Sequence, residues 1–230
     1  MIATDRFVFL HLHKAGGTFA NACIMRFVPG AQPIGYHLPR ALLPQQHLSK
    51  PLLGLVRNPW SYYVSWYAFQ SGRKQQNALF RILSDDGRKD FEGTIRGMLE
   101  LGSGSPLLGP IAASLPQRYG GNGINLPGFA LTPIAKSGLG FFSYLNRYMY
   151  AGVPAVRVAK MERLRSDFTG LLESTGFVVS DAMRAFIQNE APQNISQHAP
   201  YQTYYSAGLR DLVAERDAEV IRMHGYTFED

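Results

Sequence analysis

The feature that most constrains the fold is an apolar run near the N-terminus, followed by a glycine loop and a helical pattern. Residues 6–13 read RFVFLHLH, which is apolar over the length of a β-strand. The KAGG sequence at 14–17 breaks this pattern, and TFANACIMRF at 18–27 can form a helix that ends at Pro29-Gly30. A strand, a glycine loop and a helix in this order predict the first unit of an α/β sheet.

A second strand-to-helix turn follows a connection around Tyr36 and His37. The segment LLGLV at 52–56 predicts a short buried strand, and Arg57 lies at its end. Asn58 suits an N-cap and Pro59 suits the first helical position, so the helix WSYYVSWYAF begins directly afterwards. Its aromatic residues are too dense for one helical face. Most of them therefore belong in the core, and one or two are available to stack on a ligand ring.

The same alternation returns later in the chain. AGVPAVRVAKMERL predicts a third strand and the start of a helix, and DFTGLLESTGF predicts a short helix that stops at Gly176. Near the end, Ser206 is a plausible N-cap and Gly225 a plausible stop for a last helix. We therefore predict one P-loop-like α/β domain over residues 1–230, with a central parallel sheet flanked by helices. The Gly- and Pro-rich segment at about 102–140 predicts a loop or lid insertion.

Composition excludes several classes of protein. Hydrophobic residues make up 46% of the chain and charged residues 17%, which argues against disorder and coiled coil. The single cysteine, Cys23, allows no internal disulfide and no cysteine cluster for zinc. No apolar stretch is long enough to span a membrane, and the N-terminus has no signal-peptide pattern. We expect a cytoplasmic protein.

Positive charge is concentrated in the first third of the chain. Residues 1–84 hold nine Lys and Arg and a single acid, Asp5, so this segment carries +8 against +6 for the whole chain. A second stretch, between Glu100 and Glu162, has five basic residues and no acid. Such fields favour anionic ligands, and phosphates above all, although a generic basic surface produces the same count.

The loop at 14–17 has the chemistry of an anion site. Its glycines let the backbone approach a ligand, the following helix offers free N–H groups, and Lys14 adds a full charge. It is not a Walker A loop, because Lys14 precedes Gly16 and Gly17. Arg57 follows the next strand, so it and Lys14 can converge on one nucleotide at the sheet's carboxyl edge. The alternatives are a tight turn with a solvated lysine, and an Arg57 that pairs with a carboxylate.

Together the two motifs resemble those of sulfotransferases that use 3′-phosphoadenosine 5′-phosphosulfate (PAPS), especially the branch of carbohydrate and heparan-sulfate sulfotransferases. HKAGGT resembles the family's 5′-phosphosulfate loop. This resemblance implies that Lys14 contacts the bridging oxygen of the donor. It also implies that the loop backbone binds the donor; its residues are Ala15, Gly16, Gly17, Thr18 and Phe19.

RNPWSYYVSWY resembles the family's 3′-phosphate motif, which implies that Arg57 and Ser65 hold that phosphate. Tyr62 stands where the family often has a second arginine. The implied activity is transfer of a sulfuryl group to a hydroxyl of a carbohydrate-like acceptor, which can itself be anionic, with release of the desulfated product PAP. Asn194 and Ser196, which precede the last helix, are further candidates for donor contacts.

This chemistry needs a base for the acceptor's proton, and histidine has the fitting pKa. The chain has six: His11, His13, His37, His47, His198 and His224. We choose His37, in the turn before the second strand, with His198 as the second candidate. His11 and His13 are interpreted as structural. No metal is expected, because Lys and Arg supply the positive charge.

Two other functions stay open. A nucleotide-dependent kinase would need a metal-binding carboxylate at a strand end, where this chain has Arg57. A basic nucleic-acid-binding module that stacks bases on aromatic residues is the third hypothesis, but no RNA- or DNA-binding motif is present. We expect a hydroxyl-bearing acceptor as the partner, not a nucleic acid. The sequence gives no signal for the oligomeric state.

Overall fold

The structure, a computed structural model, describes residues 1–121, 123–191 and 198–230. The chain forms two compact units. Unit 1 comprises residues 1–57 and 147–195, and unit 2 comprises residues 58–146 and 196–230. Every strand among the described residues lies in unit 1.

Unit 1 is built on a five-stranded sheet in the order β3-β1-β2-β4-β5. The strands are β1 (Ile2–Ala3), β2 (Val8–Leu10), β3 (Gln32–Pro33), β4 (Leu52–Val56) and β5 (Arg157–Lys160). β2, β4 and β5 are parallel, with Val8 opposite Leu52 and Val56 opposite Lys160, whereas β1 and β3 form an antiparallel edge. The predicted α/β class and its parallel strands are confirmed. The antiparallel edge was not predicted, because two-residue strands have no readable periodicity.

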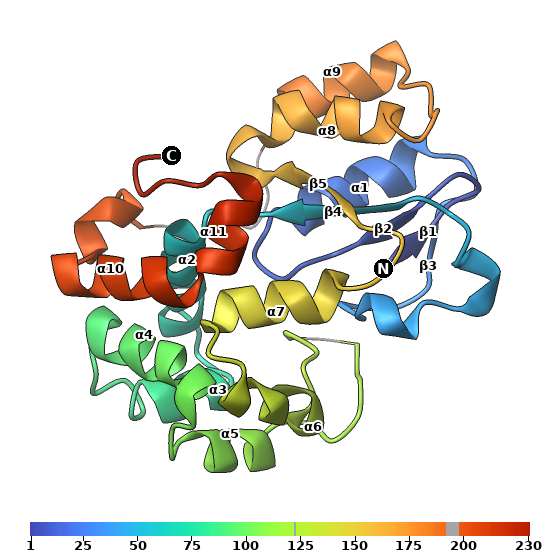
Figure 1. The fold of residues 1–230 in the computed structure, drawn as a ribbon. Helices are drawn as coiled ribbons and strands as arrows, with labels where there is room; N and C mark the ends of the chain where they lie inside the picture. The colour runs from blue at the N-terminus through green and yellow to red at the C-terminus, as the bar shows by residue number, and fades with distance from the viewer. Residues whose placement is uncertain (122, 192–197) are drawn as a thin grey trace. The chain divides into compact units, whose positions relative to one another are not determined.

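Aromatic contacts hold the helices of unit 1 against the sheet. The helices are α1 (Gly17–Phe27), η1 (Arg40–Leu42), η2 (Gln45–His47), η5 (Met161–Arg163), α8 (Leu164–Glu173) and α9 (Asp181–Asn189). Phe168 of α8 meets Phe9 of β2 and Phe19 of α1 at ring-centroid distances of 6.4 and 6.5 Å. Phe186 of α9 stacks on Phe19 at 5.7 Å. Accordingly α8 and α9 run side by side on the same side of the sheet as α1 (Figure 1).

Tyr150 holds β4 in place through a hydrogen bond to the backbone of the strand. It is the last residue of α7 (Phe141–Tyr150), a helix that begins in unit 2 and ends in unit 1. The Tyr150 hydroxyl donates to the carbonyl of Leu55 at 2.7 Å. A Cβ atom on Gly54 would lie 2.8 Å from the Tyr150 ring, so this strand position has room only for glycine. Arg57, which follows β4, is therefore carried by a firmly held strand.

Unit 2 is helical in the part of the chain that the structure describes. Besides most of α7, its helices are α2 (Pro59–Ser71), α3 (Ala78–Leu83), α4 (Phe91–Glu100), η3 (Leu101–Ser103), α5 (Leu108–Ser114), α6 (Gly128–Leu131), η4 (Thr132–Lys136), η6 (Tyr201–Tyr204), α10 (Ala207–Arg216) and α11 (Ala218–His224). α2 begins as predicted, because the Asn58 side chain accepts hydrogen bonds from the backbone of Trp60 and Ser61. Most of its aromatic residues are buried, also as predicted; they are Trp60, Tyr62, Tyr63 and Trp66.

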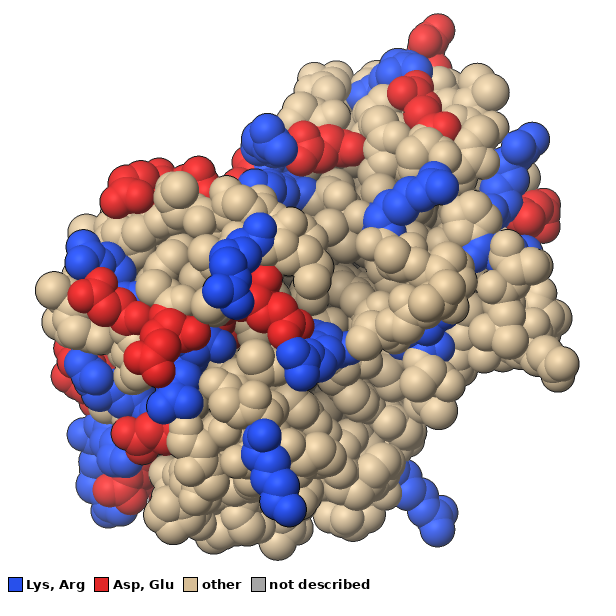
Figure 2. Space-filling model, viewed as in Figure 1, with Lys and Arg blue, Asp and Glu red and all other residues tan. Residues whose placement is uncertain are grey.

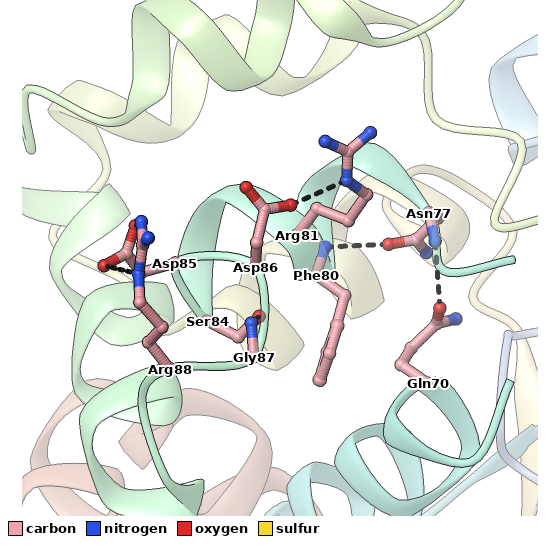
Figure 3. Close-up of polar contacts among 9 residues, drawn as sticks. All are labelled: Gln70, Asn77, Phe80, Arg81, Ser84, Asp85, Asp86, Gly87 and Arg88. Atoms are coloured by element: carbon pink, nitrogen blue, oxygen red, sulfur yellow. Dashed lines mark hydrogen bonds and ion pairs between the residues drawn. The ribbon is translucent and has the colours of Figure 1, made fainter. Parts of the chain in front are cut away.

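The segment at 102–140 contains short helices where the sequence predicts a loop. α5, α6 and η4 bury Leu108, Ile111, Leu131 and Ile134. Glycine and proline lower helix propensity, but burial of these apolar side chains outweighs that local preference. The turn after α3 is instead held by polar contacts (Figure 3). There Arg81 pairs with Asp86 at 2.8 Å, and at the other end of α3 the Asn77 side chain accepts a hydrogen bond from the backbone N–H of Phe80 at 2.8 Å.

The predicted last helix is divided at Asp217 into α10 and α11. Ser206 caps α10, and Gly225 ends α11 in a left-handed conformation with φ 60°, both as predicted. Asp217 is fully buried and accepts hydrogen bonds from the Tyr63 hydroxyl and from the Ser143 backbone N–H, each at 2.7 Å. The break was not predicted, because it is set by partners that lie 154 and 74 residues away in sequence.

Candidate functional site

The candidate site is built around the loop between β2 and α1. Lys14 and Gly16 both have left-handed backbone conformations, with φ 58° and 81°. A Cβ atom on Gly16 would lie 2.8 Å from the Met161 sulfur, so η5 packs directly against the loop. Gly16 is the N-cap residue of α1 and offers no side-chain cap. The backbone N–H groups of the first turn of this eleven-residue helix therefore face the loop.

Arg57 is drawn to the same loop. Its Nη1 atom donates to the backbone carbonyl oxygen of Lys14 at 3.1 Å. Burial and the Arg57 charge lower the pKa of Lys14 from 10.5 to about 8. Two cations are thus held together beside the start of a helix, an arrangement that an anion stabilises. Arg57 and Lys14 thus lie together in unit 1, and their convergence on one nucleotide stays a prediction.

Three histidines gather next to this loop. His37 has a left-handed backbone conformation with φ 45°, and its Nδ1 atom lies 2.6 Å from the carbonyl oxygen of His11. The ring centroids of His37 and His11 are 4.2 Å apart, and those of His37 and His13 are 5.8 Å apart. His13 directly precedes Lys14 and its ring lies beside that of His37, so the His13 side chain links His37 to the loop.

Burial keeps these histidines neutral. It lowers the pKa of His37 from 6.5 to about 4, although the hydrogen bond to His11 raises it. Burial, with the nearby His37 charge, also lowers the pKa of His11 and of His13 well below its usual value. A carbonyl oxygen can only accept, so His37 Nδ1 carries the proton and Nε2 keeps a lone pair. Neutral His37 can therefore accept a proton at Nε2.

His11 connects the histidine group to helix α1. A Cβ atom on Gly17 would lie 1.8 Å from His11 Cδ2, so the imidazole lies against the first residue of the helix. The Asn21 side chain, one turn further along α1, donates from Nδ2 to His11 Nδ1 at 3.1 Å. The interpretation of His11 as structural fits these contacts. The role of Asn21 was not predicted, and its one signal is the i, i+4 spacing from Gly17.

The remaining candidates are distributed between the units. Ala15 is buried in the loop, and Phe19 places its side chain in the core of unit 1, which leaves only its backbone for a ligand. Ser65 lies on α2 in unit 2 and is 3% exposed. His198 also belongs to unit 2, where its Nδ1 atom lies 2.7 Å from the carbonyl of Ala199. Asn194 and Ser196 lie outside the described residues.

One further cation was missed by the sequence reading. Lys160 is the last residue of β5 and pairs in register with Val56, the residue before Arg57. The carboxyl ends of β2, β4 and β5 are therefore each followed or ended by a cation. The sequence contained a signal for Lys160, because this residue lies at the end of the predicted third strand, and the ends of parallel strands meet at one edge of a sheet.

Positive and negative side chains are mixed over several helices on the face of the molecule shown in Figure 2. Figure 2 shows Lys and Arg interspersed with Asp and Glu over α10 and α4 in unit 2, and over α8 and α9 in unit 1. Among the described residues, no group of three or more His, Cys, Asp or Glu side chains is placed to hold a metal ion. Within the same residues, no helix has the length and apolar character needed to cross a membrane.

Comparison with known proteins gives matches among solved structures. No family model matches the chain, and no curated protein matches it significantly. Among solved structures, the chain is similar to the crystal structure of mouse sulfotransferase SULT7A1 complexed with PAP, with 14% sequence identity and a TM-score of 0.49. The match covers 96% of this chain and 87% of that one.

Proposed function

We propose that this protein is a sulfotransferase that transfers the sulfuryl group of PAPS to a hydroxyl of a carbohydrate-like acceptor and releases PAP. The observation that carries the proposal is the approach of Arg57 to Lys14 at the start of α1. PAPS brings several phosphate and sulfate charges, and two cations beside a helix N-terminus are suited to bind them. The motif resemblance that assigns Lys14 and Arg57 to the donor supports the same conclusion.

The proposed reaction assigns a role to each group. The acceptor oxygen attacks sulfur, an S–O bond forms to the acceptor, and the bond from sulfur to the bridging oxygen of PAPS breaks. Lys14 stabilises the negative charge that develops on this bridging oxygen, which leaves as part of PAP. His37 Nε2 takes the proton of the attacking hydroxyl. Arg57 holds the 3′-phosphate, and the backbone from Ala15 to Phe19 holds the 5′-phosphosulfate.

Calorimetry with PAP tests the donor site. We expect Lys14→Ala and Arg57→Ala each to weaken PAP binding by about 10- to 100-fold, because a hydrogen bond to a charged group contributes about 1.5–3 kcal/mol. Lys74→Ala is the matched control, since Lys74 is an exposed residue of unit 2. ATP without magnesium is the comparator ligand. A folded wild-type protein that does not bind PAP would overturn the proposal.

The charge coupling gives a second measurement. Because the Arg57 charge lowers the pKa of Lys14, Arg57→Gln should raise that pKa from its value of about 8. Bound PAP should also raise it in the wild type, because an anion favours the protonated amine. NMR titration of the Lys14 side chain measures both shifts. A Lys14 pKa that is unchanged by saturating PAP would place the ligand away from this loop.

A further inference from the structure

The helices α6 and η4 of unit 2 follow each other directly and present one exposed side. Leu131 and Ile134 point inward and are fully buried. The exposed residues are spaced three and four apart, and they are Phe129, Thr132, Pro133 and Lys136. Residues with this spacing share one side of a helix, so Phe129 and Lys136 lie on the same side. Seven helical residues separate them by about 10–14 Å.

A second aromatic ring packs against Phe129. Tyr119, from the segment between α5 and α6, meets Phe129 edge to face, with ring centroids 5.8 Å apart and an angle of 89° between the rings. Phe129 is nevertheless 56% exposed, and Tyr119 is half-buried. The C–H groups on one side of a sugar ring can pack on the negative face of such an aromatic ring. We call Arg118, Tyr119, Phe129 and Lys136 together the α6 face.

The backbone that carries the α6 face is firmly held. The backbone N–H of Gly128 donates to the carbonyl of Pro116 at 3.0 Å, which ties the segment before Arg118 to the start of α6. α5 lies beside α6 (Figure 1), and a Cβ atom on Gly128 would lie 2.1 Å from the carbonyl oxygen of Ala112. The Tyr144 hydroxyl donates to the carbonyl of Ala130. A surface fixed in this way loses little conformational entropy when a ligand binds.

The two cations of the α6 face have no acidic partner. Arg118 and Lys136 are exposed, and neither side chain forms an ion pair with a described residue. By contrast, Arg96 of α4 in the same unit pairs with Glu92 at 2.6 Å. The sequence from residue 101 to residue 161 contains no Asp or Glu. Charge complementarity therefore favours an anionic ligand at this face.

We propose that the α6 face binds an acidic oligosaccharide. One sugar ring packs on Phe129 and Tyr119, and carboxylate or sulfate groups on this ring and a neighbouring ring pair with Arg118 and Lys136. The separation of Phe129 from Lys136 calls for more than one sugar ring. Single-stranded nucleic acid stacks successive bases along a basic groove, whereas the α6 face offers one pair of rings and two separate cations. The identification of this saccharide as an outer part of the acceptor rests on the proposed function, but the binding face itself does not.

A matched pair of saccharides tests the class of ligand. Hyaluronan hexasaccharide and chitohexaose have the same number of rings, but only hyaluronan carries carboxylates. NMR titration of the Phe129 and Tyr119 ring protons measures their binding to the wild type, with hexathymidylate as the nucleic-acid probe. We expect saturable shifts with hyaluronan and an affinity for chitohexaose that is at least about fourfold lower, because two exposed ion pairs are lost.

Three results of these titrations would contradict the proposal. Equal affinities for the two saccharides would remove the role of the cations. Tighter binding of hexathymidylate than of hyaluronan would replace the saccharide by a nucleic acid. Ring protons that do not shift with hyaluronan would show that the α6 face is not a saccharide site.

A ring variant locates the binding. Phe129→Ala removes an exposed side chain and should lower the affinity for hyaluronan by at least about fivefold, because the stacked ring is lost. Met223→Ala is the control, since Met223 is 64% exposed on α11 in the same unit, and it should leave the affinity unchanged. Equal affinities in the two variants would place the saccharide elsewhere.

A charge variant tests the cations separately. Arg118→Gln combined with Lys136→Gln should weaken hyaluronan binding by about 4- to 25-fold, and this effect should shrink at high salt. Arg73→Gln combined with Lys74→Gln is the matched control, because it removes the same two charges from exposed positions of unit 2. If both double variants lost the same affinity, general attraction by the net charge would explain the binding.

PAP binding in the same samples separates the two proposals. A protein that binds hyaluronan at Phe129 but does not bind PAP keeps the saccharide face and loses the sulfotransferase function. A protein that binds PAP, but shows no shift of the Phe129 ring with hyaluronan, keeps the donor site and loses the saccharide face.

Discussion

His37 Nδ1 lies 2.6 Å from the carbonyl oxygen of His11, and this contact fixes where His37 carries its proton. His11 directly follows β2, and its backbone carbonyl accepts this hydrogen bond. The bond therefore also connects the turn before β4 to the segment that leads from β2 into the Lys14 loop. The left-handed backbone of His37, with φ 45°, orients the residue for this bond. The proposed base is therefore positioned by the same segment that positions the proposed donor loop.

The first prediction concerns turnover without His37. His37→Ala should lower turnover by about 10²- to 10⁴-fold, the usual contribution of a general base, and should leave PAP affinity unchanged. His198→Ala is the matched control in unit 2. Steady-state rates and PAP calorimetry on both variants measure the effects. Unchanged turnover in the His37 variant, together with loss of turnover in the His198 variant, would show that the assignment of the base is wrong.

The pH dependence of the same reaction follows from the pKa of about 4 for His37. A base must be neutral to accept a proton, so the acidic limb of kcat/KM should lie at a pH of about 4. The bound donor is an anion and favours imidazolium, so the acidic limb of kcat should lie at higher pH. Rate profiles from about pH 2.5 to pH 8 measure the acidic limbs of kcat/KM and of kcat, and an acidic limb of kcat/KM near the ordinary histidine pKa would contradict the buried, neutral His37.

Local signals in the sequence were sufficient for the parts of the fold that carry the loop. β4 at 52–56 and the start of α2 were predicted at their observed positions, because a five-residue apolar run and an Asn-Pro cap act on neighbouring residues. The left-handed Gly16 and the end of α1 at Phe27 follow from the same kind of local rule.

Contacts between segments that are distant in the chain could not be predicted from the sequence. The meeting of His11 and His37 depends on a turn 26 residues later in the chain, and neither residue alone indicates it. Lys160 becomes a neighbour of the β4 end only through strand register. Likewise, the helices in the segment at 102–140 form because their apolar residues are buried by other parts of unit 2, which no local propensity reports.

The next prediction tests the contact between Gly17 and His11. Gly17→Ala would place a methyl group 1.8 Å from His11 Cδ2, so the imidazole must move and the hydrogen bond from Asn21 must break. We expect weaker PAP binding and a shift of the His37 ring resonances. Gly170→Ala is the matched control, because a methyl group there meets nothing within 4 Å on helix α8 of the same unit. That control should stabilise the protein by about 0.5–1 kcal/mol. If Gly17→Ala bound PAP with wild-type affinity, the His11 contact would have no part in the site.

The last prediction concerns the polar centre of unit 2. Tyr63→Phe removes the donor to Asp217 Oδ2 and the acceptor for the backbone N–H of Phe142 at 3.1 Å. Each of these two buried groups left without a partner costs about 1–3 kcal/mol, so the free energy of unfolding should fall by about 2–6 kcal/mol. Phe69→Leu, a change on the half-buried side of α2, is the control for a lost aromatic ring and should cost less. Urea denaturation measures both variants.

The same centre gives a pH dependence with a definite sign. Burial raises the pKa of Asp217 from 3.8 to about 6, although the hydrogen bonds from Tyr63 and Ser143 lower it. The folded state therefore binds this proton more tightly than the unfolded chain, and the stability that it contributes is lost as the pH rises from about 4 to about 6. Tyr63→Phe removes one of the hydrogen bonds that lower the pKa of Asp217, so this pKa should be higher in the variant. The variant should therefore go on losing stability at pH values above about 6, where the wild type no longer does. A wild type and a Tyr63→Phe variant whose unfolding free energies differ by the same amount at pH 5 and pH 8 would contradict this coupling.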